Sequence, residues 1–366
     1  MDGLETTSKI EEKLCYKASL DNIPLSGAME LLPLCNMDCK MCYIKLTNEQ
    51  MNKCGRLRTA DEWLDIAIQM KESGTLFVLL TGGEIFLYKE FEKLYKGLID
   101  MGMIITLNTN GTLINEKIAD MLVSSKPRRV NITLYGGSNE TYSKLCKNPK
   151  GYDQTIRGIN LLKSRNIDVK INVSLVKDNM EDLPKLLEVA NSLELPIEVD
   201  TYMYPKTKGI KSEFKFECRI EPKKVAHIDT FIRYNTETEE SFNRNRLNYL
   251  DKYELTKKST PPEVLKLSCR AGKSSFWIDW QGNMYPCVFL DNHKIDVFEN
   301  GFSKSWDYVV NESDKILFPS KCTSCNKRDV CQVCPAAALS ENKTMDKSPS
   351  YLCELTSEFI NILEQN

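Results

Sequence analysis

The sequence predicts an α/β protein built on a parallel sheet, followed by a small cysteine-rich domain. From about residue 27 to residue 204, short apolar segments rich in Val, Ile and Leu alternate with amphipathic segments. Such alternation is typical of β-α-β units, and the apolar character indicates strands buried on both faces. The small domain is predicted because seven of the 14 cysteines fall between Cys269 and Cys353. The pattern alone fits both an open doubly wound sheet and a partial barrel.

The expected elements follow one another in strict alternation. Six strands are expected at 28–34, 76–80, 103–108, 130–134, 169–176 and 197–202. Helices are expected near 59–73, 88–101, 116–125, 155–164, 183–193 and, outside the sheet, 222–234. Thr59 is a plausible N-cap of the first helix, whose acidic start and basic end suit the helix dipole.

Four segments are predicted along the chain. Residues 1–26 form an N-terminal extension, 27–235 the barrel, 236–267 a polar bridge, and 268–366 the small domain with a C-terminal helix. The small domain has little regular apolar pattern, so burial alone would stabilise it poorly and metal sites would help it fold.

Composition excludes several classes of protein. The 366 residues are 42% hydrophobic and 27% charged, with a net charge of −2, which supports neither a nucleic-acid partner nor a basic membrane surface. Apolar runs such as 76–80 are too short to span a bilayer, and the N-terminus lacks the pattern of a secretory signal. We therefore expect a cytoplasmic protein.

Cysteine and histidine counts indicate metal chemistry. Fourteen cysteines in a reducing compartment argue against disulfides, while only two histidines, His227 and His293, argue against Cys/His zinc sites. The isolated Cys15, Cys54, Cys146 and Cys218 are expected to be structural.

The first cysteine cluster has the spacing C-x3-C-x2-C, formed by Cys35, Cys39 and Cys42 directly after the first expected strand. Three thiolates can hold three irons of a [4Fe–4S] cluster and leave the fourth iron open, whereas ordinary clusters use four cysteines. A zinc site and incidental cysteines remain as alternatives.

This motif, followed by Tyr43, resembles the signature of radical S-adenosylmethionine enzymes. The resemblance implies a partial (β/α)6 barrel. It also implies that S-adenosylmethionine binds the open iron and is split to a 5′-deoxyadenosyl radical. Cys35, Cys39 and Cys42 are then the catalytic residues. The cofactor-binding residues that it implies lie mostly at strand ends; they are Tyr43, Gly82, Gly83, Glu84, Asn110, Thr133 and Ser174.

The second cysteine cluster resembles the SPASM domain of the same enzymes, which normally holds two auxiliary [4Fe–4S] clusters. The resemblance implies an outer cluster on Cys322, Cys325, Cys331 and Cys353. It implies an inner cluster on Cys269, Cys287 and Cys334. The chain would thus hold three [4Fe–4S] clusters.

Two departures from the SPASM pattern affect the inner cluster. The last spacing, Cys331 to Cys334, is C-x2-C where the family usually has C-x3-C. Some relatives also carry a fourth cysteine of the inner cluster a few residues before the first one, and here residues 259–268 contain none. The inner cluster therefore has an open iron, unless Cys218 or a ligand other than cysteine fills it. In addition, Val288 stands where sulfatase maturases carry an aspartate.

The resulting hypothesis is an oxidoreductase that removes hydrogen from a ribosomally made peptide, which becomes cross-linked or oxidised. Its expected partners are a peptide or small-protein substrate, a reductant such as a flavodoxin or ferredoxin, and a separate peptide-recognition protein. The alternatives are formylglycine formation as in sulfatase maturases, which Val288 disfavours, a non-enzymatic iron–sulfur electron carrier, and a zinc-stapled binding module. Tyr202 and Tyr204, after the sixth strand, are expected to pack rather than to relay radicals.

Overall fold

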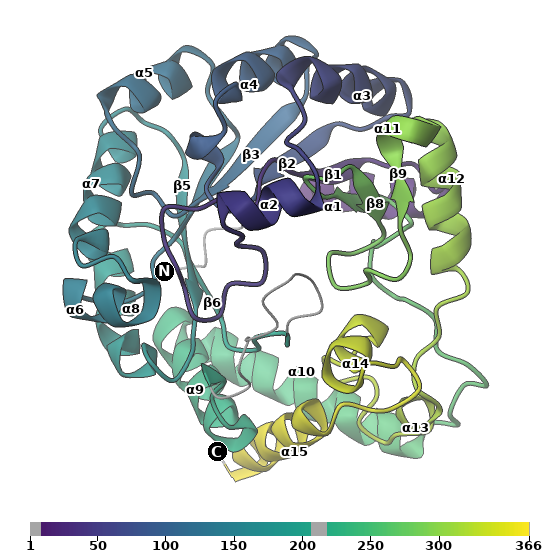
Figure 1. The fold of residues 1–366 in the computed structure, drawn as a ribbon. Helices are drawn as coiled ribbons and strands as arrows, with labels where there is room; N and C mark the ends of the chain where they lie inside the picture. Colours follow the sequence, from purple (N-terminus) through teal and green to yellow (C-terminus); the bar gives the residue numbers. More distant parts are fainter. Residues whose placement is uncertain (1–8, 206–217, 366) are drawn as a thin grey trace.

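The computed structural model describes residues 9–205 and 218–365 and shows one nine-stranded sheet, in the order β6-β5-β4-β3-β2-β1-β7-β8-β9 (Figure 1). The first six strands are parallel and lie in chain order, so each connection crosses to the neighbouring strand. Their bounds are Ser26–Glu30 (β1), Phe77–Thr81 (β2), Ile104–Thr109 (β3), Arg129–Thr133 (β4), Val169–Ser174 (β5) and Ile197–Asp200 (β6). The predicted α/β fold with a parallel sheet is confirmed, and the six strands lie where the apolar segments placed them.

Helices cover the outer face of this sheet, in chain order, as Figure 1 shows. They are α3 (Ala60–Glu72), α4 (Phe91–Asp100), α5 (Glu116–Ser124), α7 (Gly151–Lys163) and α8 (Leu183–Ser192). Thr59 does cap α3: its side chain accepts the backbone N–H of Glu62, and the Glu62 carboxylate accepts the N–H of Thr59 in return. The sheet and its helices share one core, in which Trp63, Tyr95 and Tyr142 are fully buried.

The start of the predicted small domain continues the barrel sheet. Strand β7 (Ser275–Ile278) pairs in parallel with β1, and β8 (Asn283–Tyr285) and β9 (Ile295–Asp296) follow antiparallel to it. Gly27 of β1 makes this pairing close, because a Cβ there would lie 2.2 Å from the ring of Phe276. The cysteine-rich segment is therefore joined to the barrel by backbone hydrogen bonds as well as by the chain.

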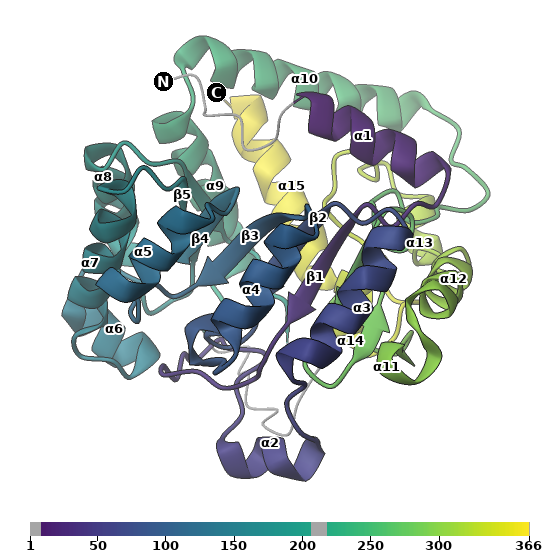
Figure 2. The ribbon, with the colours of Figure 1, turned by 90° about the horizontal axis from the view of Figure 1, so that it is seen from above.

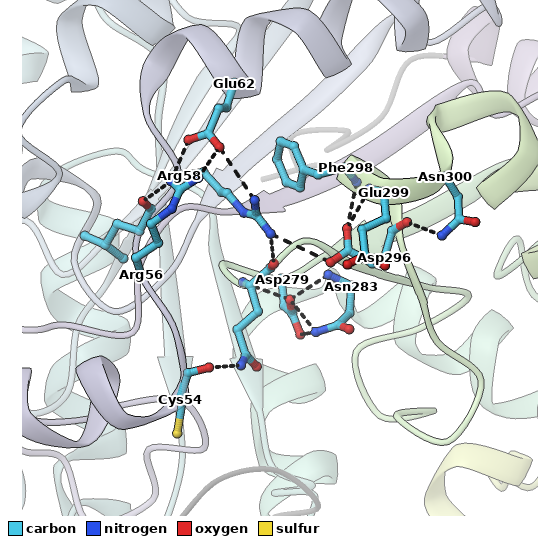
Figure 3. A network of polar contacts seen from close by, with 12 residues as sticks. Cys54, Arg56, Arg58, Glu62, Asp279, Asn283, Asp296, Phe298, Glu299 and Asn300 are labelled. Atoms are coloured by element: carbon cyan, nitrogen blue, oxygen red, sulfur yellow. Dashed lines mark hydrogen bonds and ion pairs between the residues drawn. The ribbon is translucent and has the colours of Figure 1, made fainter.

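A network of polar contacts fastens the same junction (Figure 3). The Arg58 guanidinium donates to the Gln281 carbonyl at 2.9 Å, lies 3.7 Å from Asp296 and covers the Phe298 ring at 4.2 Å. In the same region, the Gln281 side chain donates to the Cys54 carbonyl at 2.9 Å. The segment before α3 thus holds the β7–β9 extension against the barrel.

Several helices escaped prediction from the sequence. The longest, α10 (Glu239–Lys258), lies within the segment predicted to be a polar bridge, and only Phe242 and Thr256 on it are buried. A helix that is polar on nearly every side has no apolar stripe to reveal it.

The other helices outside the barrel core are α1 (Lys9–Leu20), α2 (Asn48–Cys54), α6 (Asn139–Cys146), α9 (Pro222–Thr236), α11 (Val297–Asn300), α12 (Phe302–Ser313), α13 (Ser320–Thr323), α14 (Pro335–Asn342) and α15 (Ser350–Gln365).

Helices α9, α10 and α15 form a second layer beside the sheet. Helix α15 packs against α9 and α10, and Figure 2 shows α10 and α1 along the same side of the molecule. The predicted C-terminal helix is therefore part of a helical layer that joins the end of the barrel to the cysteine-rich segment. Among the described residues, no helix is both long and apolar enough to cross a membrane.

Candidate active site

A cavity of about 350 Å³ opens where the parallel strands end at their carboxyl termini. This is the edge at which barrel enzymes place their chemistry. The cavity is lined by the three cysteines of the first motif together with glycine, methionine, tyrosine and a few polar side chains. They are Cys35, Met37, Cys39, Met41, Cys42, Tyr43, Ile44, Gly82, Gly83, Tyr135, Ser174, Asp200, Tyr202, Met203, Tyr204 and Phe289.

The cysteine loop is a closed loop whose three thiols face this cavity. The backbone N–H of Leu46 donates to the Pro33 carbonyl at 3.0 Å and closes the loop at its base. The N–H groups of Asp38 and Lys40 donate to carbonyls at the end of α6, with a distance of 2.8 Å from Asp38 to Cys146. Backbone hydrogen bonds to the barrel therefore hold the loop in place.

The electrostatics of the three thiols favours a cationic partner. Burial, with smaller contributions from Glu84, Cys39 and Cys42 and against a hydrogen bond from the Met37 N–H, raises the pKa of Cys35 to about 12. A hydrogen bond with Cys146 and burial raise the pKa of Cys39 well above its usual value, while a hydrogen bond from Tyr135 opposes them. Three thiolates this close are unstable unless positive charge offsets them, and iron supplies that charge. Thiolate ligands and half-burial fit an iron–sulfur cluster.

Gly82 and Gly83 line the cavity because the chain after β2 presses against the segment before the cysteine loop. The N–H of Gly83 donates to the Leu32 carbonyl at 2.8 Å, and a Cβ on Gly83 would lie 2.1 Å from the Leu34 carbonyl oxygen. Gly82 has a φ of +150°, and a Cβ on it would lie 2.7 Å from the Leu32 carbonyl oxygen. The two glycines thus position the cysteine loop as well as exposing backbone to the cavity.

The Glu84 side chain has another environment than the resemblance implies. Its carboxylate is fully buried and accepts hydrogen bonds from the Thr109 hydroxyl at 2.8 Å, the Asn110 N–H at 2.9 Å and the Phe86 N–H at 3.2 Å. It is not among the described residues that line the cavity. In the structure this carboxylate ties the end of β2 to the end of β3; a role in binding the cofactor amine stays a prediction.

Asn110 connects β3 to the cysteine loop. Its side-chain amide donates to the Asn36 side chain at 2.9 Å and lies 3.7 Å from the Cys35 sulfur, while its carbonyl oxygen accepts from Thr112. Asn110 is buried and is not among the cavity-lining residues, so the structure places it behind Cys35. It is a positioning residue for that cysteine.

Three further cofactor-binding candidates differ in their placement. Tyr43 and Ser174 line the cavity, whereas Thr133, at the end of β4, is not among the described lining residues. Ser174 lies beside Asp200, its register partner on β6. The cofactor contacts of all three stay predictions.

Several cavity residues were missed by the sequence analysis. Asp200 is the one carboxylate among the described lining residues, and burial first and then Glu198 raise its pKa. Asp200 and Tyr135 lie at or just beyond strand ends, a position that could have marked them. Phe289 comes from the cysteine-rich segment, so no local signal connects it to the barrel.

The C-terminal cysteines gather in two groups. Cys325, Cys331 and Cys353 all raise the pKa of Cys322, after burial, so these four thiols share one neighbourhood. A second group comprises Cys269, Cys287 and Cys334, which all act on Tyr204. The structure therefore brings together the residues that the resemblance assigns to the outer and the inner cluster. Among the described residues, no three His, Cys, Asp or Glu side chains converge on a site for a single metal ion.

Cys218 and Val288 bear on the two departures from the SPASM pattern. The charged groups that influence the buried Cys218 thiol are Asp178, Arg219 and Lys40, which places this thiol beside the first cysteine loop. Val288 is buried. The fourth ligand of the inner group stays open.

Comparison with known proteins identifies one domain of the chain. The model of the radical SAM superfamily matches residues 29–190. An AdoMet-dependent heme synthase of Methanosarcina barkeri is 23% identical over 87% of this chain and 93% of its own length. The subtilosin biosynthesis protein AlbA of Bacillus subtilis is 22% identical over 88% of this chain and 69% of its own.

Solved structures give the same fold. SuiB of Streptococcus suis, crystallised with its precursor peptide SuiA, superposes with a TM-score of 0.64 at 19% identity and covers 94% of this chain and 80% of its own. The segment matched by the family model contains Cys35, Cys39 and Cys42. Strands β2 to β5 lie within it, and it begins inside β1. Residues 29–190 of this chain therefore form a radical SAM domain.

Proposed function

We propose that this protein cleaves S-adenosylmethionine at a [4Fe–4S] cluster held by Cys35, Cys39 and Cys42, and oxidises a peptide by removing a hydrogen atom. The observation that carries the proposal is that these three thiols and the Gly82–Gly83 backbone line one cavity at the carboxyl edge of the sheet. Bound there, the cluster would supply an open iron and one electron. The chain supplies a loop that is already closed and a cavity that limits access of water.

We propose further that the cysteine-rich segment holds two auxiliary [4Fe–4S] clusters, as in a SPASM domain. The grouping of Cys322 with Cys325, Cys331 and Cys353 supports the outer site. The common influence of Cys269, Cys287 and Cys334 on Tyr204 supports the inner site. An inner site beside the cavity is suited to accept an electron from an oxidised substrate.

The cavity surface supports a peptide side chain as the reacting group. Its described lining is aromatic and methionine-rich, and it contains the carboxylate of Asp200 but no Lys, Arg or His. Aromatic and thioether surfaces accept apolar and aromatic side chains of varied shape. SuiB, which has this fold, was crystallised with a precursor peptide.

A second candidate substrate is a heme precursor. It is favoured by the similarity to AdoMet-dependent heme synthase, which extends over 93% of that relative. A tetrapyrrole carries several carboxylates, which need cationic partners when buried. The described cavity lining offers none, so we rank the peptide first.

Other features of the proposal concern partners and location. The cluster needs a low-potential reductant, for which a flavodoxin or ferredoxin is the proposed class, and a separate recognition protein could present the peptide. We propose a cytoplasmic enzyme with no nucleic-acid or membrane partner, since the net charge is −2.

The test is anaerobic reconstitution with iron and sulfide, followed by addition of S-adenosylmethionine and dithionite. We expect 5′-deoxyadenosine in the wild type and in Cys54→Ala, whose cysteine lies outside all three groups. A yield no higher than that of cluster-free protein would refute the enzyme and leave the electron carrier.

The substrate class is tested with the same preparation. A panel of cysteine-rich peptides and a heme precursor are incubated separately, and products are analysed by mass spectrometry. We expect a peptide to lose the mass of two hydrogens; conversion of the heme precursor alone would instead establish the second candidate.

A further inference from the structure

Three aromatic rings form a continuous bridge across the cavity. The rings of Tyr43 and Phe289 have centroids 6.1 Å apart. Phe289 and Tyr204 stack almost in parallel, with centroids 4.1 Å apart and an interplanar angle of 8°. All three residues line the cavity. They come from three distant parts of the chain, so only the folded protein brings them together.

Each end of this aromatic bridge is attached to a different cysteine group. Tyr43 follows Cys42 directly in the chain. At the other end, the Tyr204 hydroxyl lies 3.9 Å from the sulfur of Cys334. Phe289, in the middle, is two residues beyond Cys287. The bridge therefore runs from the first cysteine motif to the group that comprises Cys269, Cys287 and Cys334.

The contact at Cys334 has a defined chemical direction. A phenol has an ordinary pKa of about 10 and keeps its proton at neutral pH, so next to a metal-bound thiolate the Tyr204 hydroxyl is the donor. The same sulfur accepts the N–H of Ala337 at 3.4 Å, in the first turn of α14. Two donors thus converge on one sulfur. Hydrogen bonds to sulfur are among the factors that set the reduction potential of an iron–sulfur cluster.

We propose that Tyr204 is a positioning residue that raises the reduction potential of the inner auxiliary cluster by donating a hydrogen bond to the Cys334 sulfur, and that Phe289 holds its ring in place. The proposal rests on the proposed function, because it requires a cluster on Cys334. Donation stabilises the more negative, reduced state, so the potential rises. A cluster that is easier to reduce accepts an electron more readily from a substrate in the adjoining cavity.

Tyr202 provides a matched comparison. It lines the same cavity two residues earlier, and its ring meets that of Tyr204 at a centroid distance of 4.6 Å. Its hydroxyl, however, donates to the Glu341 carboxylate at 2.7 Å and not to a sulfur. Removing one hydroxyl or the other therefore separates an effect on the sulfur from a general effect on the cavity.

The experiment is a redox titration of reconstituted full-length protein, followed by electron paramagnetic resonance. In Tyr204→Phe we expect one auxiliary signal to shift to a lower midpoint potential, while the signal that responds to S-adenosylmethionine keeps its potential. Tyr202→Phe should titrate as the wild type does. Unchanged potentials in Tyr204→Phe, or an equal shift in Tyr202→Phe, would overturn the proposal.

A second variant covers the case in which Tyr204→Phe loses the inner cluster. Replacing Tyr204 with 3-fluorotyrosine keeps the ring and makes the hydroxyl a stronger donor, so the same signal should move to a higher potential; no shift refutes the proposal. Iron analysis distinguishes a failure of the proposed function from a failure of the proposal for Tyr204. A wild-type chain with only about four irons refutes the auxiliary clusters and the proposed function that includes them, whereas a full iron content without a shift refutes the role of Tyr204 alone.

Discussion

The two cysteine regions of this chain are held in place by different kinds of contact. The first cysteine loop is tied to distant elements: Asp38 bonds to Cys146, and Gly83, at the end of β2, bonds to Leu32 just before the loop. In the outer C-terminal group the backbone contacts are local. The N–H of Cys325 donates to Cys322, and that of Cys331 donates to Lys327.

This difference predicts different roles for metal at the two sites. The first loop is shaped by the barrel, so removing a ligand there should abolish chemistry while the fold survives. The outer group lies on the four-residue helix α13, a turn and the start of α15, with Cys353 exposed. A segment whose cysteines have only local backbone hydrogen bonds gains stability from a cluster that joins its parts.

The largest effect is expected from Cys39→Ala. This change removes one of three thiolates from the first motif, so formation of 5′-deoxyadenosine should fall to the level of cluster-free protein. Because the loop is fixed by the barrel, the melting temperature of the metal-free protein should stay close to that of wild type. Cys54→Ala serves as the control in both the nucleoside assay and the melt. A large drop in melting temperature in Cys39→Ala would show that the loop is not preorganised.

Cys322→Ala should give the opposite pattern. We expect loss of about four irons per chain and a lower melting temperature of the reconstituted protein, because a cluster that joins α13 to α15 would be missing. Cleavage of S-adenosylmethionine without substrate should continue, whereas conversion of the peptide should fail. Iron analysis, calorimetry and the nucleoside assay measure the three quantities. An unchanged iron content would contradict the outer site.

The sequence alone was sufficient to predict those features that depend on residues close together in the chain. The strands were predictable from apolar runs, and the Thr59 N-cap from its place before the acidic start of a helix. The C-x3-C-x2-C motif predicted a cysteine group that the structure places in one cavity. Placement in space was harder: β7 pairs with β1 across more than two hundred residues, and nothing in either segment specifies that pairing.

Side-chain roles were the least predictable part of the site. Glu84 was expected to bind the cofactor amine, which stays a prediction; in the structure its carboxylate accepts hydrogen bonds from Thr109 and Asn110. A strand end exposes some groups to a cavity and buries others, and the sequence does not distinguish them. Asp200 is the opposite case: it lies at a strand end and lines the cavity, but the sequence analysis did not single it out.

Asp200→Asn should have a smaller effect than either cysteine variant, confined to substrate conversion. Asp200 is exposed towards the cavity, and its surroundings and Glu198 raise the pKa of its carboxyl. Its carboxylate can accept a proton there, whereas an amide of the same shape cannot. Loss of a general base typically lowers turnover by about 10²–10⁴-fold. Cleavage of S-adenosylmethionine should be largely preserved. The half-buried Asp229, whose carboxylate accepts a hydrogen bond from Thr201 at 2.8 Å, is the control as Asp229→Asn. Equal loss in both variants would refute a role in proton transfer.

The smallest effect is expected at the junction that joins the two regions. Arg58 is largely buried, with 19% of its side chain exposed, and contacts Gln281, Asp296 and Phe298 across that junction. Arg56, with 64% exposed, pairs only with Glu62 and Leu57 among the contacts drawn in Figure 3. Arg58→Ala should therefore lower the free energy of unfolding by roughly 1.5–3 kcal/mol, the range for hydrogen bonds to charged groups, and Arg56→Ala by much less. Denaturation in urea measures both. If Arg56→Ala were the more damaging, the β7–β9 extension would be held by its strand pairing with β1, and the two cysteine regions would be joined through the sheet alone.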